Sequence, residues 1–484
     1  MPIHPQLLNR AIVTPLVLLI ACVTIARPSV AERPEPLSGQ QTEQIAVAAD
    51  WSEFSGGDVD ATAALQRLID QSDGAVELPP GVFRLTRPLE IDLTQLGYRA
   101  IRGSSATRLV MAGPGPALRF RGSHFKSADP GGFADRIWTD ERMPTVTEVA
   151  IEGAHESADG IEAAGTMQLT IQRVHLRKLR HGIRLIENNR NVIVDSCHIY
   201  ENSGVGIYYD DVNLHQSNIT GCHVSYCGGG GIVSRRGNVR NLHITGCDLE
   251  SNMSADTEPT ANVLIDCRGS VSGTAEVAIT GCTIQHNDRG PESANIRIIG
   301  QGDPSANGET AGWGHVTITG NVLSDVQTNL WLQSCRGVTV IGNTFWMGFD
   351  YNLRVEDSSH VVIGPNNFDR NPRYSYGRAS QAKNRLLVRD SADCTLNGLH
   401  IAHVHHGEAA LTLQNCDRMH VTGLTILDCD RPLRLIDVDR SRITNCLIRD
   451  DRPDRDRDDS LESRSAAVEI EGGTDTVLDD SVRG

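Results

Sequence analysis

Apolar and polar residues alternate in short runs through most of this chain. The segments VTITG (316–320) and VTVIG (338–342) place β-branched residues at every second position, which is the period of a strand with one buried face. Similar runs recur between residues 160 and 450, without the 3.6-residue period of an amphipathic helix. The pattern predicts an all-β protein built from many short strands.

These strands belong to an internal repeat. Each repeat contains an Ile-Thr-Gly-like tetrapeptide, and in the clearest copies this tetrapeptide ends in Cys or Asn. Most successive copies are 22–25 residues apart, and the longer steps are 33, 35 and 39 residues. A repeat of this length predicts a solenoid. The clearest copies are VDSC (194–197), ITGC (219–222, 244–247 and 279–282), ITGN (318–321), VIGN (340–343) and IGPN (363–366).

A second strand opens each repeat, ahead of the tetrapeptide. Examples are GIRL (182–185), GIYY (206–209) and NLWL (329–332), in which inward apolar residues alternate with variable outward ones. Strand, turn and strand at this spacing predict a single-stranded, right-handed parallel β-helix with three short strands per coil.

The last residue of the tetrapeptide is Cys or Asn in a common turn position. Neighbouring coils lie about 4.8 Å apart, and the Cα atoms of a disulfide lie roughly 4.4–6.8 Å apart. The distance therefore allows a disulfide, but parallel Cβ vectors fit one poorly. Because Cys interchanges with Asn, we expect buried, free thiols stacked at Cys197, Cys222, Cys247 and Cys282. Disulfides and a metal site are the alternatives.

The N-terminal part of the repeat region reads GGDVDATAALQRLIDQSDGAVELPPGVFRLTRPLEI (56–91). Ala64, Leu65, Leu68 and Ile69 form one apolar face of a short helix, which can close the first coil. This segment resembles the start of the pectate-lyase superfamily, specifically its rhamnogalacturonase/epimerase-like branch. Over residues 50–450 the resemblance implies a capped β-helix. It also implies activity on carbohydrate, bound along the outer face of the strand that opens each coil.

The catalytic motifs of the better-known branches are missing. The chain has no match to the Asn-Thr-Asp, Asp-Asp, His-Gly and Arg-Ile-Lys set of polygalacturonases, nor to the Asp-Pro-His of alginate epimerases. Only Tyr209-Asp210-Asp211 occupies a similar place to the latter. The resemblance therefore leaves the reaction open.

Composition and the N-terminus narrow the biological setting. A formal net charge of −16 without a basic stripe argues against a nucleic-acid partner. Residues 1–31 resemble an export signal, with Arg10 before a short apolar run. Cleavage after Ala31 and lipidation of Cys22 are both compatible with this segment, and the lipid would be the one membrane anchor. We expect a monomeric, extracytoplasmic protein.

The domain organisation follows from these features. After the export signal we expect a capped β-helix over residues 50–449. Residues 450–465 are rich in Asp and Arg and read as a charged linker. Residues 466–484 are then a last strand and a tail.

Alternation assigns the residues that face outward from the opening strands. A first row contains Glu162, Arg184, Tyr208, Val233, Leu264, Arg297, Trp331, Arg354 and Leu387. A second row, two residues further along, contains Asp210, Arg235, Asp266, Gln333, Glu356 and Arg389. Insertions after Asp266 and Ile299 flank the same coils and predict the walls of a cleft.

Candidate catalytic residues come from these rows. Asp210 and Asp266 lie two coils apart, which fits the spacing of the carboxyls in inverting glycosidases. Glu162 and Asp210 form a second candidate pair. Arg235 is a candidate base for β-elimination, and His215 could reach the cleft from the following turn. The Asp, Glu and Arg residues could instead form ion pairs between coils, and His215 could be a structural histidine.

Candidate substrate-binding residues lie beside them. Arg297 and Arg354 suit bidentate binding of carboxylate or sulfate groups. Trp331 and Trp313 suggest a platform on which sugar rings stack, although Trp313 could instead hold its own loop against the coil. Tyr208 is a further binding residue and an alternative base.

Metal sites have weaker support. His403, His405 and His406 resemble a metal cluster, but alternation directs them to different faces, so no metal is assigned there. Asp210, Asp211 and Asp266 are the candidates for a calcium ion if their carboxylates converge. The sequence as a whole favours an exported enzyme that cleaves an acidic polysaccharide by lyase or hydrolase chemistry. The alternative is a non-catalytic carbohydrate-binding or cell-surface protein.

Overall fold

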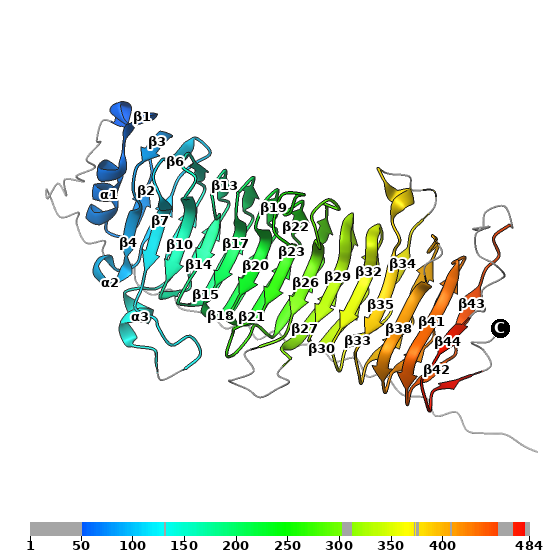
Figure 1. Ribbon diagram of the computed structural model, residues 1–484. Helices are drawn as coiled ribbons and strands as arrows, with labels where there is room; N and C mark the ends of the chain where they lie inside the picture. Colours follow the sequence, from blue (N-terminus) through cyan, green and yellow to red (C-terminus); the bar gives the residue numbers. More distant parts are fainter. Residues whose placement is uncertain are drawn as a thin grey trace, which may run out of the picture. The chain divides into compact units, whose positions relative to one another are not determined.

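The computed structural model describes residues 51–129, 132–302, 312–371, 373, 377–406, 409–453 and 468–479. The predicted export signal with Cys22, and most of the predicted charged linker, lie outside these residues. Three parallel sheets contain nearly all the strands, and the chain passes from one sheet to the next in turn (Figure 1). Apart from the end strands and β11, each strand therefore pairs with the equivalent strand one coil earlier and one coil later. The predicted all-β parallel β-helix with three strands per coil is confirmed.

The 14-stranded sheet contains the opening strand of each coil. Its strands are β4 (Leu89–Asp92), β7 (Gly115–Arg121), β10 (Ala158–Ala164), β14 (Ile183–Leu185), β17 (Val205–Asp210), β20 (Gly230–Arg235), β23 (Ala261–Asp266), β26 (Ala294–Ile299), β29 (Val326–Gln333), β32 (Gly348–Glu356), β35 (Arg385–Arg389), β38 (Ala409–Asp417), β41 (Arg431–Asp439) and β44 (Val468–Glu471).

The 16-stranded sheet follows in each coil. It contains β2 (Ala75–Glu77), β5 (Ala100–Arg102), β8 (Thr145–Thr147), β12 (Thr170–Gln172), β15 (Asn188–Asp195), β18 (Asn213–Thr220), β21 (Asn238–Thr245), β24 (Val277–Thr280), β27 (Gly314–Thr319), β30 (Arg336–Ile341), β33 (Val362–Ile363), β36 (Thr395–Asn397), β39 (His420–Thr422), β42 (Arg442–Thr444) and β45 (Val477–Leu478), with β11 (Thr166–Met167) beside β15.

The 15-stranded sheet completes the coil. It contains β1 (Gly56–Asp60), β3 (Gly81–Leu85), β6 (Thr107–Met111), β9 (Ala150–Gly153), β13 (His175–Arg177), β16 (His198–Tyr200), β19 (His223–Ser225), β22 (Asp248–Glu250), β25 (Thr283–Gln285), β28 (Val322–Ser324), β31 (Thr344–Phe345), β34 (Asn367–Asp369), β37 (His400–Ala402), β40 (Thr425–Leu427) and β43 (Leu447–Arg449).

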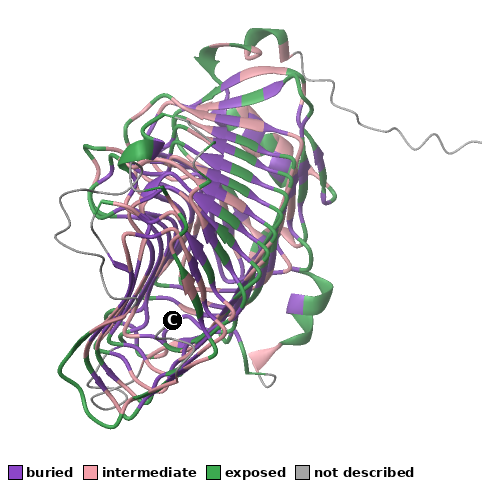
Figure 2. Cartoon of the chain, turned by 90° about the vertical axis from the view of Figure 1, so that its right-hand side faces the viewer, coloured by how far each residue is buried: buried purple, intermediate pink, exposed green. Residues whose placement is uncertain are grey.

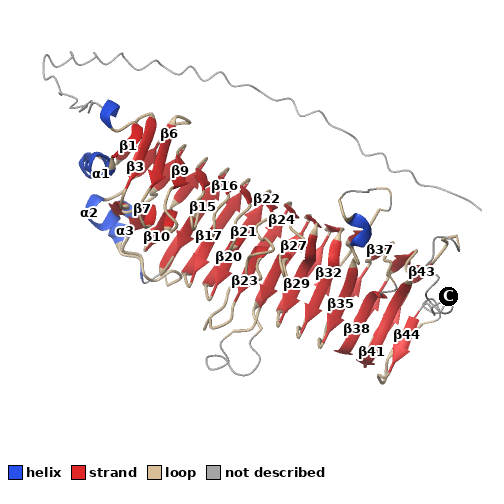
Figure 3. Cartoon of the chain, turned by 45° about the horizontal axis from the view of Figure 1, so that its top comes forward, coloured by secondary structure: helices blue, strands red, loops and turns tan. Residues whose placement is uncertain are grey.

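Helix α1 (Thr62–Gln71) caps the first coil, as predicted (Figure 3). Leu65 and Ile69 of this helix are fully buried. Gln66 exchanges two hydrogen bonds of 2.9 Å with the backbone of Glu90 in β4, so the cap also satisfies polar groups of an edge strand. The other helical segments are η1 (Trp51–Glu53), α2 (Leu93–Leu96), α3 (Asp135–Thr139) and η3 (Ala379–Gln381). No described helix has the length and apolar composition needed to cross a bilayer.

The core consists of stacked side chains inside the coils, and buried and exposed positions alternate along the strands (Figure 2). All eleven cysteines in the described residues are buried and free, which confirms the predicted thiol stack. The backbone N–H of Cys247 donates to Sγ of Cys282 at 3.4 Å. The stack continues in amides, where Asn343 Nδ2 donates to Asn366 Oδ1 at 3.0 Å. Thiol and amide are thus interchangeable steps of one ladder.

A second ladder runs along the turn before the 14-stranded sheet. Asn252 donates to Asn262 at 2.8 Å, and Asn262 donates to Asn295 at 2.8 Å. Asn287 lies five residues after Cys282, as Asn252 does after Cys247, but it does not join this ladder, because the longer turn before β23 brings Asn262 next to Asn252 instead. The backbone N–H of Asn287 contacts Met253 Sδ.

Candidate functional site

The outer face of the 14-stranded sheet carries the two predicted rows in the predicted register. In the first row Tyr208 pairs with Val233, Leu264 with Arg297, and Arg297 with Trp331. In the second row Arg235 lies between Asp210 and Asp266. A one-residue slip would have turned both rows into the core, so the alternation was interpreted correctly.

The two aspartates of the second row are each held by an arginine. Asp210 Oδ2 accepts hydrogen bonds from Arg184 at 2.6 and 3.0 Å. Asp266 accepts from Arg268 at 2.6 and 2.9 Å. Burial alone would raise the pKa of Asp266, but the hydrogen bonds and charge of Arg268 outweigh it and lower this pKa. Asp266 is therefore ionised at neutral pH.

Arg235, between the two aspartates, has no such partner. Among the residues that the structure describes, none forms a hydrogen bond or an ion pair with its guanidinium, and its Nε is buried. Because Arg184 and Arg268 already neutralise the neighbouring carboxylates, the charge of Arg235 remains uncompensated. Arg235 is half-buried and its Nε lacks a hydrogen-bond acceptor, which an anionic ligand would supply.

Tyr208 and His181 lie beside this row. Their ring centroids are 5.3 Å apart. Burial, followed by the charge of Asp210 and a hydrogen bond to it, raises the pKa of Tyr208 to about 12. Burial also lowers the pKa of His181. His181 Nδ1 accepts the backbone N–H of Val205 at 3.0 Å, so the neutral ring carries its proton on Nε2.

His181 is a site residue that the sequence interpretation missed. It directly precedes the GIRL strand, in the position that Val205 takes one coil later. A histidine at a repeat position where the next coil has valine was the signal in the sequence that could have identified it.

Trp331 faces outward from the coil but is not exposed. It belongs to a buried apolar cluster on the outer face that also contains Val205, Val233 and Leu264, and only 4% of its surface is accessible. The guanidinium carbons of Arg297 and Arg354 lie 3.8 and 4.1 Å from its ring centroid. Because β26 and β32 flank β29, these arginines cover both ring faces. The prediction that Trp331 offers a face to a sugar ring is wrong.

The two arginines predicted to bind substrate are the ones that stack on Trp331. Arg297 donates to Gln333 Oε1 at 3.0 and 2.9 Å. Arg354 forms an ion pair with Glu356 at 2.9 Å. The charge of Arg354 is therefore balanced by a carboxylate of the protein. The side-chain partner of Arg297 is a neutral amide, which leaves its charge unbalanced.

Glu162 is the centre of an ion-pair cluster. Arg119, Arg184 and Arg121 approach its carboxylate to 2.9, 3.3 and 3.6 Å, and its side chain is 7% exposed. Arg184 also binds Asp210, so it bridges both members of the second predicted carboxylate pair. Glu162 therefore forms the ion pairs that are the alternative to a catalytic role, and its catalytic role remains a prediction.

His215 and Trp313 lie away from this face. His215 is on β18 of the 16-stranded sheet, where Arg190 and Arg240 pair with it on either side. Trp313 lies 5.2 Å from the Arg240 guanidinium and against Gly273. A Cβ on Gly273 would lie 2.3 Å from Trp313 Cγ, so the ring needs this glycine. Trp313 therefore holds its insertion to the coil, and neither residue joins Asp210.

The predicted metal candidates do not converge. In the described ranges, no three His, Cys, Asp or Glu side chains are arranged to hold a metal ion. Asp211 instead lies 3.7 Å from Arg236. His403 Nδ1 contacts Asp369 at 2.9 Å, and His406 contacts the Ser380 carbonyl.

Comparison with known protein families supports the architecture. A model described as "Right handed beta helix region" matches residues 119–284. The chain is a right-handed parallel β-helix protein. A second model, "Periplasmic copper-binding protein (NosD)", matches residues 270–451 of this β-helix. A search of curated proteins found no match.

Solved structures share the β-helix at low sequence identity. A tailspike protein of E. coli bacteriophage HK620, solved with a pentasaccharide, is 11% identical with a TM-score of 0.55, over 88% of this chain and 78% of that one. The Dettilon tailspike protein gp208 is 12% identical with a TM-score of 0.46, over 75% of this chain and 64% of its own, less than two thirds of its length. The A-module of Azotobacter vinelandii mannuronan C-5 epimerase AlgE6 is 12% identical with a TM-score of 0.37, over 88% and 97%.

Proposed function

We propose that this β-helix protein binds an acidic polysaccharide along the outer face of β17, β20, β23 and β26 and cleaves it outside the cytoplasm. The observation that carries the proposal is the unpartnered guanidinium of Arg235 between two neutralised aspartates. A guanidinium forms two parallel hydrogen bonds to a carboxylate or sulfate, which a uronate or sulfated sugar supplies. Arg297, one strand beyond Asp266, extends the positive side of the face.

The proposed chemistry is hydrolysis by Asp210 and Asp266. Two strand spacings of about 4.8 Å separate their Cα atoms by about 9–10 Å, and inverting glycosidases hold their carboxyls roughly 6.5–9.5 Å apart with a water between them. Asp266, whose pKa is lowered, is the proposed base. Asp210, next to Tyr208, is the proposed acid. Elimination has less support because Tyr208, with a pKa of about 12, keeps its proton, and because the Nδ1 lone pair of His181 is already used.

Two comparisons support the setting. A protein of the same fold, the HK620 tailspike, binds a pentasaccharide. The match to a periplasmic family agrees with the predicted N-terminal export signal. No copper site is proposed, because in the described part of residues 270–451 no three metal-binding side chains converge.

Binding without cleavage is the second candidate function. It is favoured by the ion pairs of Asp210 with Arg184 and of Asp266 with Arg268, since paired carboxylates are poorer acids and bases than free ones. Substrate would have to displace these arginines for hydrolysis, but not for binding.

The test uses polygalacturonate, alginate, hyaluronan and chondroitin sulfate. Binding is measured by calorimetry, hydrolysis by new reducing ends, and elimination by the ultraviolet absorbance of unsaturated uronates. We expect binding to at least one polymer, weakened in Arg235→Ala and unchanged in Arg442→Ala, a change on the 16-stranded sheet. New reducing ends without absorbance support hydrolysis. Binding alone favours the second candidate, and no binding to any of the four polymers contradicts the proposal.

A further inference from the structure

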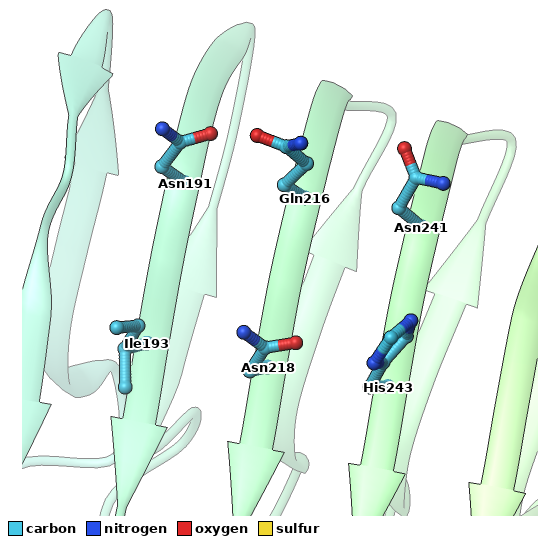
Figure 4. A pocket seen from close by; sticks show the side chains of 6 residues that line it. All are labelled: Asn191, Ile193, Gln216, Asn218, Asn241 and His243. Atoms are coloured by element: carbon cyan, nitrogen blue, oxygen red, sulfur yellow. The ribbon is translucent and has the colours of Figure 1, made fainter. Parts of the chain in front are cut away.

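A hollow of about 380 Å³ lies on the outer face of the 16-stranded sheet, on β15, β18 and β21. Two rows of side chains line it, and Figure 4 shows one row in equivalent positions of three neighbouring strands and the other row further along the same strands. The rows contain Asn191, Gln216 and Asn241, and Ile193, Asn218 and His243. Four of the six side chains are primary amides, and none belongs to Asp, Glu, Lys or Arg.

The backbone forms this hollow by a regular bend. Asn191, Gln216 and Asn241 have φ values of 54°, 64° and 55°, in the left-handed region that Asn tolerates better than most residues. Strand pairing resumes on both sides of the bend, so the three amides keep equivalent positions in successive coils. The hollow is therefore a built feature of three coils.

The amides of the hollow are largely uncommitted. In the part of the chain that the structure describes, the side chains of Asn191, Gln216 and Asn218 form no hydrogen bond, and Asn191 Oδ1 is buried without a donor. Asn241 donates to Glu276 at 3.0 Å. Each free amide offers a carbonyl acceptor and an NH₂ donor. The amides of Gln216 and Asn218 are exposed, so they can bond to a ligand hydroxyl without giving up a partner inside the protein.

We propose that this hollow is a second binding site, for neutral sugar units recognised through their hydroxyls. A hydroxyl both donates and accepts, so it matches an amide, and the hollow lacks the fixed charge that a uronate or sulfate would require. Ile193, 40% exposed, offers a contact for the C–H face of a sugar ring. An extended glycan would pass its hydroxyls along amides that recur at every coil, about 4.8 Å apart.

This site is separate from the acidic-polymer face. It lies on the following sheet of the same coils, with Gln216 six residues after Asp210 and Asn241 six residues after Arg235. The proposal does not depend on hydrolysis by Asp210 and Asp266. Its ligand also differs in charge, so the failure of one site can be distinguished from the failure of the other.

The test uses neutral hexasaccharides of glucose, mannose, galactose, xylose and N-acetylglucosamine, titrated by calorimetry into the full-length protein. We expect at least one of them to bind, and the Asn218→Ala/His243→Ala double variant to weaken that binding about 5-fold or more, since each lost neutral hydrogen bond is worth about 2- to 10-fold. Both changed residues are exposed, so the fold should persist, as melting curves will check. Thr339→Ala changes the same row three coils beyond His243, and should leave the affinity unchanged.

The other results overturn the proposal. One is that none of the five hexasaccharides binds at millimolar concentration. Another is that the double variant and Thr339→Ala bind equally well. The third is that Arg235→Ala loses hexasaccharide binding, which would place the ligand on the 14-stranded sheet. Polygalacturonate serves as the counter-probe, and its affinity should not change in the double variant.

Discussion

Trp331 donates its indole N–H to a carboxylate oxygen of Glu356 at 2.8 Å, and both residues are buried although they project from the outside of the coil. Arg354 and Arg389 bind the same carboxylate. The outer face of β29, β32 and β35 is thus a small polar core of its own. It lies on the same sheet as Asp210, Arg235 and Asp266, and β26 separates it from β23.

Replacing Trp331 should therefore affect stability. Trp331→Ala removes a buried indole with arginines on both faces, and we expect a loss of about 3–5 kcal/mol in the free energy of unfolding. Trp331→Phe retains an aromatic surface and loses the bond to Glu356, so it should cost less. Denaturant unfolding of both variants measures the difference. An unchanged midpoint for Trp331→Ala, with weaker polysaccharide binding, would show that the ring is available to ligand.

Glu162→Gln should weaken the fold without a selective effect on turnover. The change leaves Arg119, Arg121 and Arg184 around a neutral amide, and hydrogen bonds to charged groups are worth about 1.5–3 kcal/mol each. We expect a lower unfolding midpoint and normal activity per folded molecule. Glu469→Gln, in the same row near the C-terminal end, is the control for a less buried partner. A large loss of turnover at an unchanged midpoint would support the predicted catalytic role of Glu162.

Asp210→Asn and Asp266→Asn test the proposed hydrolysis. Each change retains the size of the side chain and removes its capacity for proton transfer, which is worth about 10²–10⁴-fold. Turnover of a confirmed polymer should fall by that order while binding persists through Arg235. Asp195→Asn, on the 16-stranded sheet, is a matched control. Full activity in the Asp210→Asn/Asp266→Asn double variant would end the two-carboxylate mechanism.

Asp325 should make stability depend on pH. Burial raises its pKa, although Ser324 donates a hydrogen bond to it and His286 lies nearby. The folded state then holds its proton to a higher pH than the unfolded state, whose pKa is about 3.9. This group therefore lowers stability as the pH rises from about 4 toward neutral.

Asp325→Asn should consequently stabilise the protein at pH 7, and the gain should shrink toward pH 4. Asn also suits the backbone there, where φ is 61°. Urea unfolding at pH 4, 5.5 and 7 measures the effect. A variant less stable than the parent at pH 7 would show that the charge of Asp325 is favourable.

The stacked thiols should be chemically inert until the protein unfolds. The contact with the preceding thiol, together with burial, raises the pKa of Cys222 and of Cys247 to about 12, and burial raises that of Cys227 to about 11. Iodoacetamide should modify these residues slowly in the native protein and fully in urea without reductant. Mass spectrometry that finds Cys197, Cys222, Cys247 and Cys282 linked to one another would contradict the free-thiol ladder.

The repeat made the fold and the two outward rows predictable, because a strand has a period of two and each coil repeats the previous one. Asp210, Arg235 and Asp266 could be aligned on that basis alone. The burial of Trp331 could not be predicted in this way, because it depends on long side chains from the two neighbouring coils that cover the ring.

Irregular segments were the other limit. The places of Trp313 and of Asn262 depend on the path of long turns that follow no period. Ion pairs such as Arg184 with Asp210 depend on rotamers, which alternation does not specify. For these reasons the rows were predicted and the partners within them were not.

The ladder from Cys197 to Asn366 gives the chain a natural unit of length. Successive rungs bond to each other, and Cys197, Cys222 and Cys247 are 25 residues apart, so removing one such step would bring two equivalent rungs together. Removing residues 223–247 would join Cys222 to Asp248, whose coil already begins with the same strand. We therefore expect the protein to tolerate the removal or insertion of a whole coil between Asp210 and Asp266. Each such change would alter the distance between these two residues by one strand spacing.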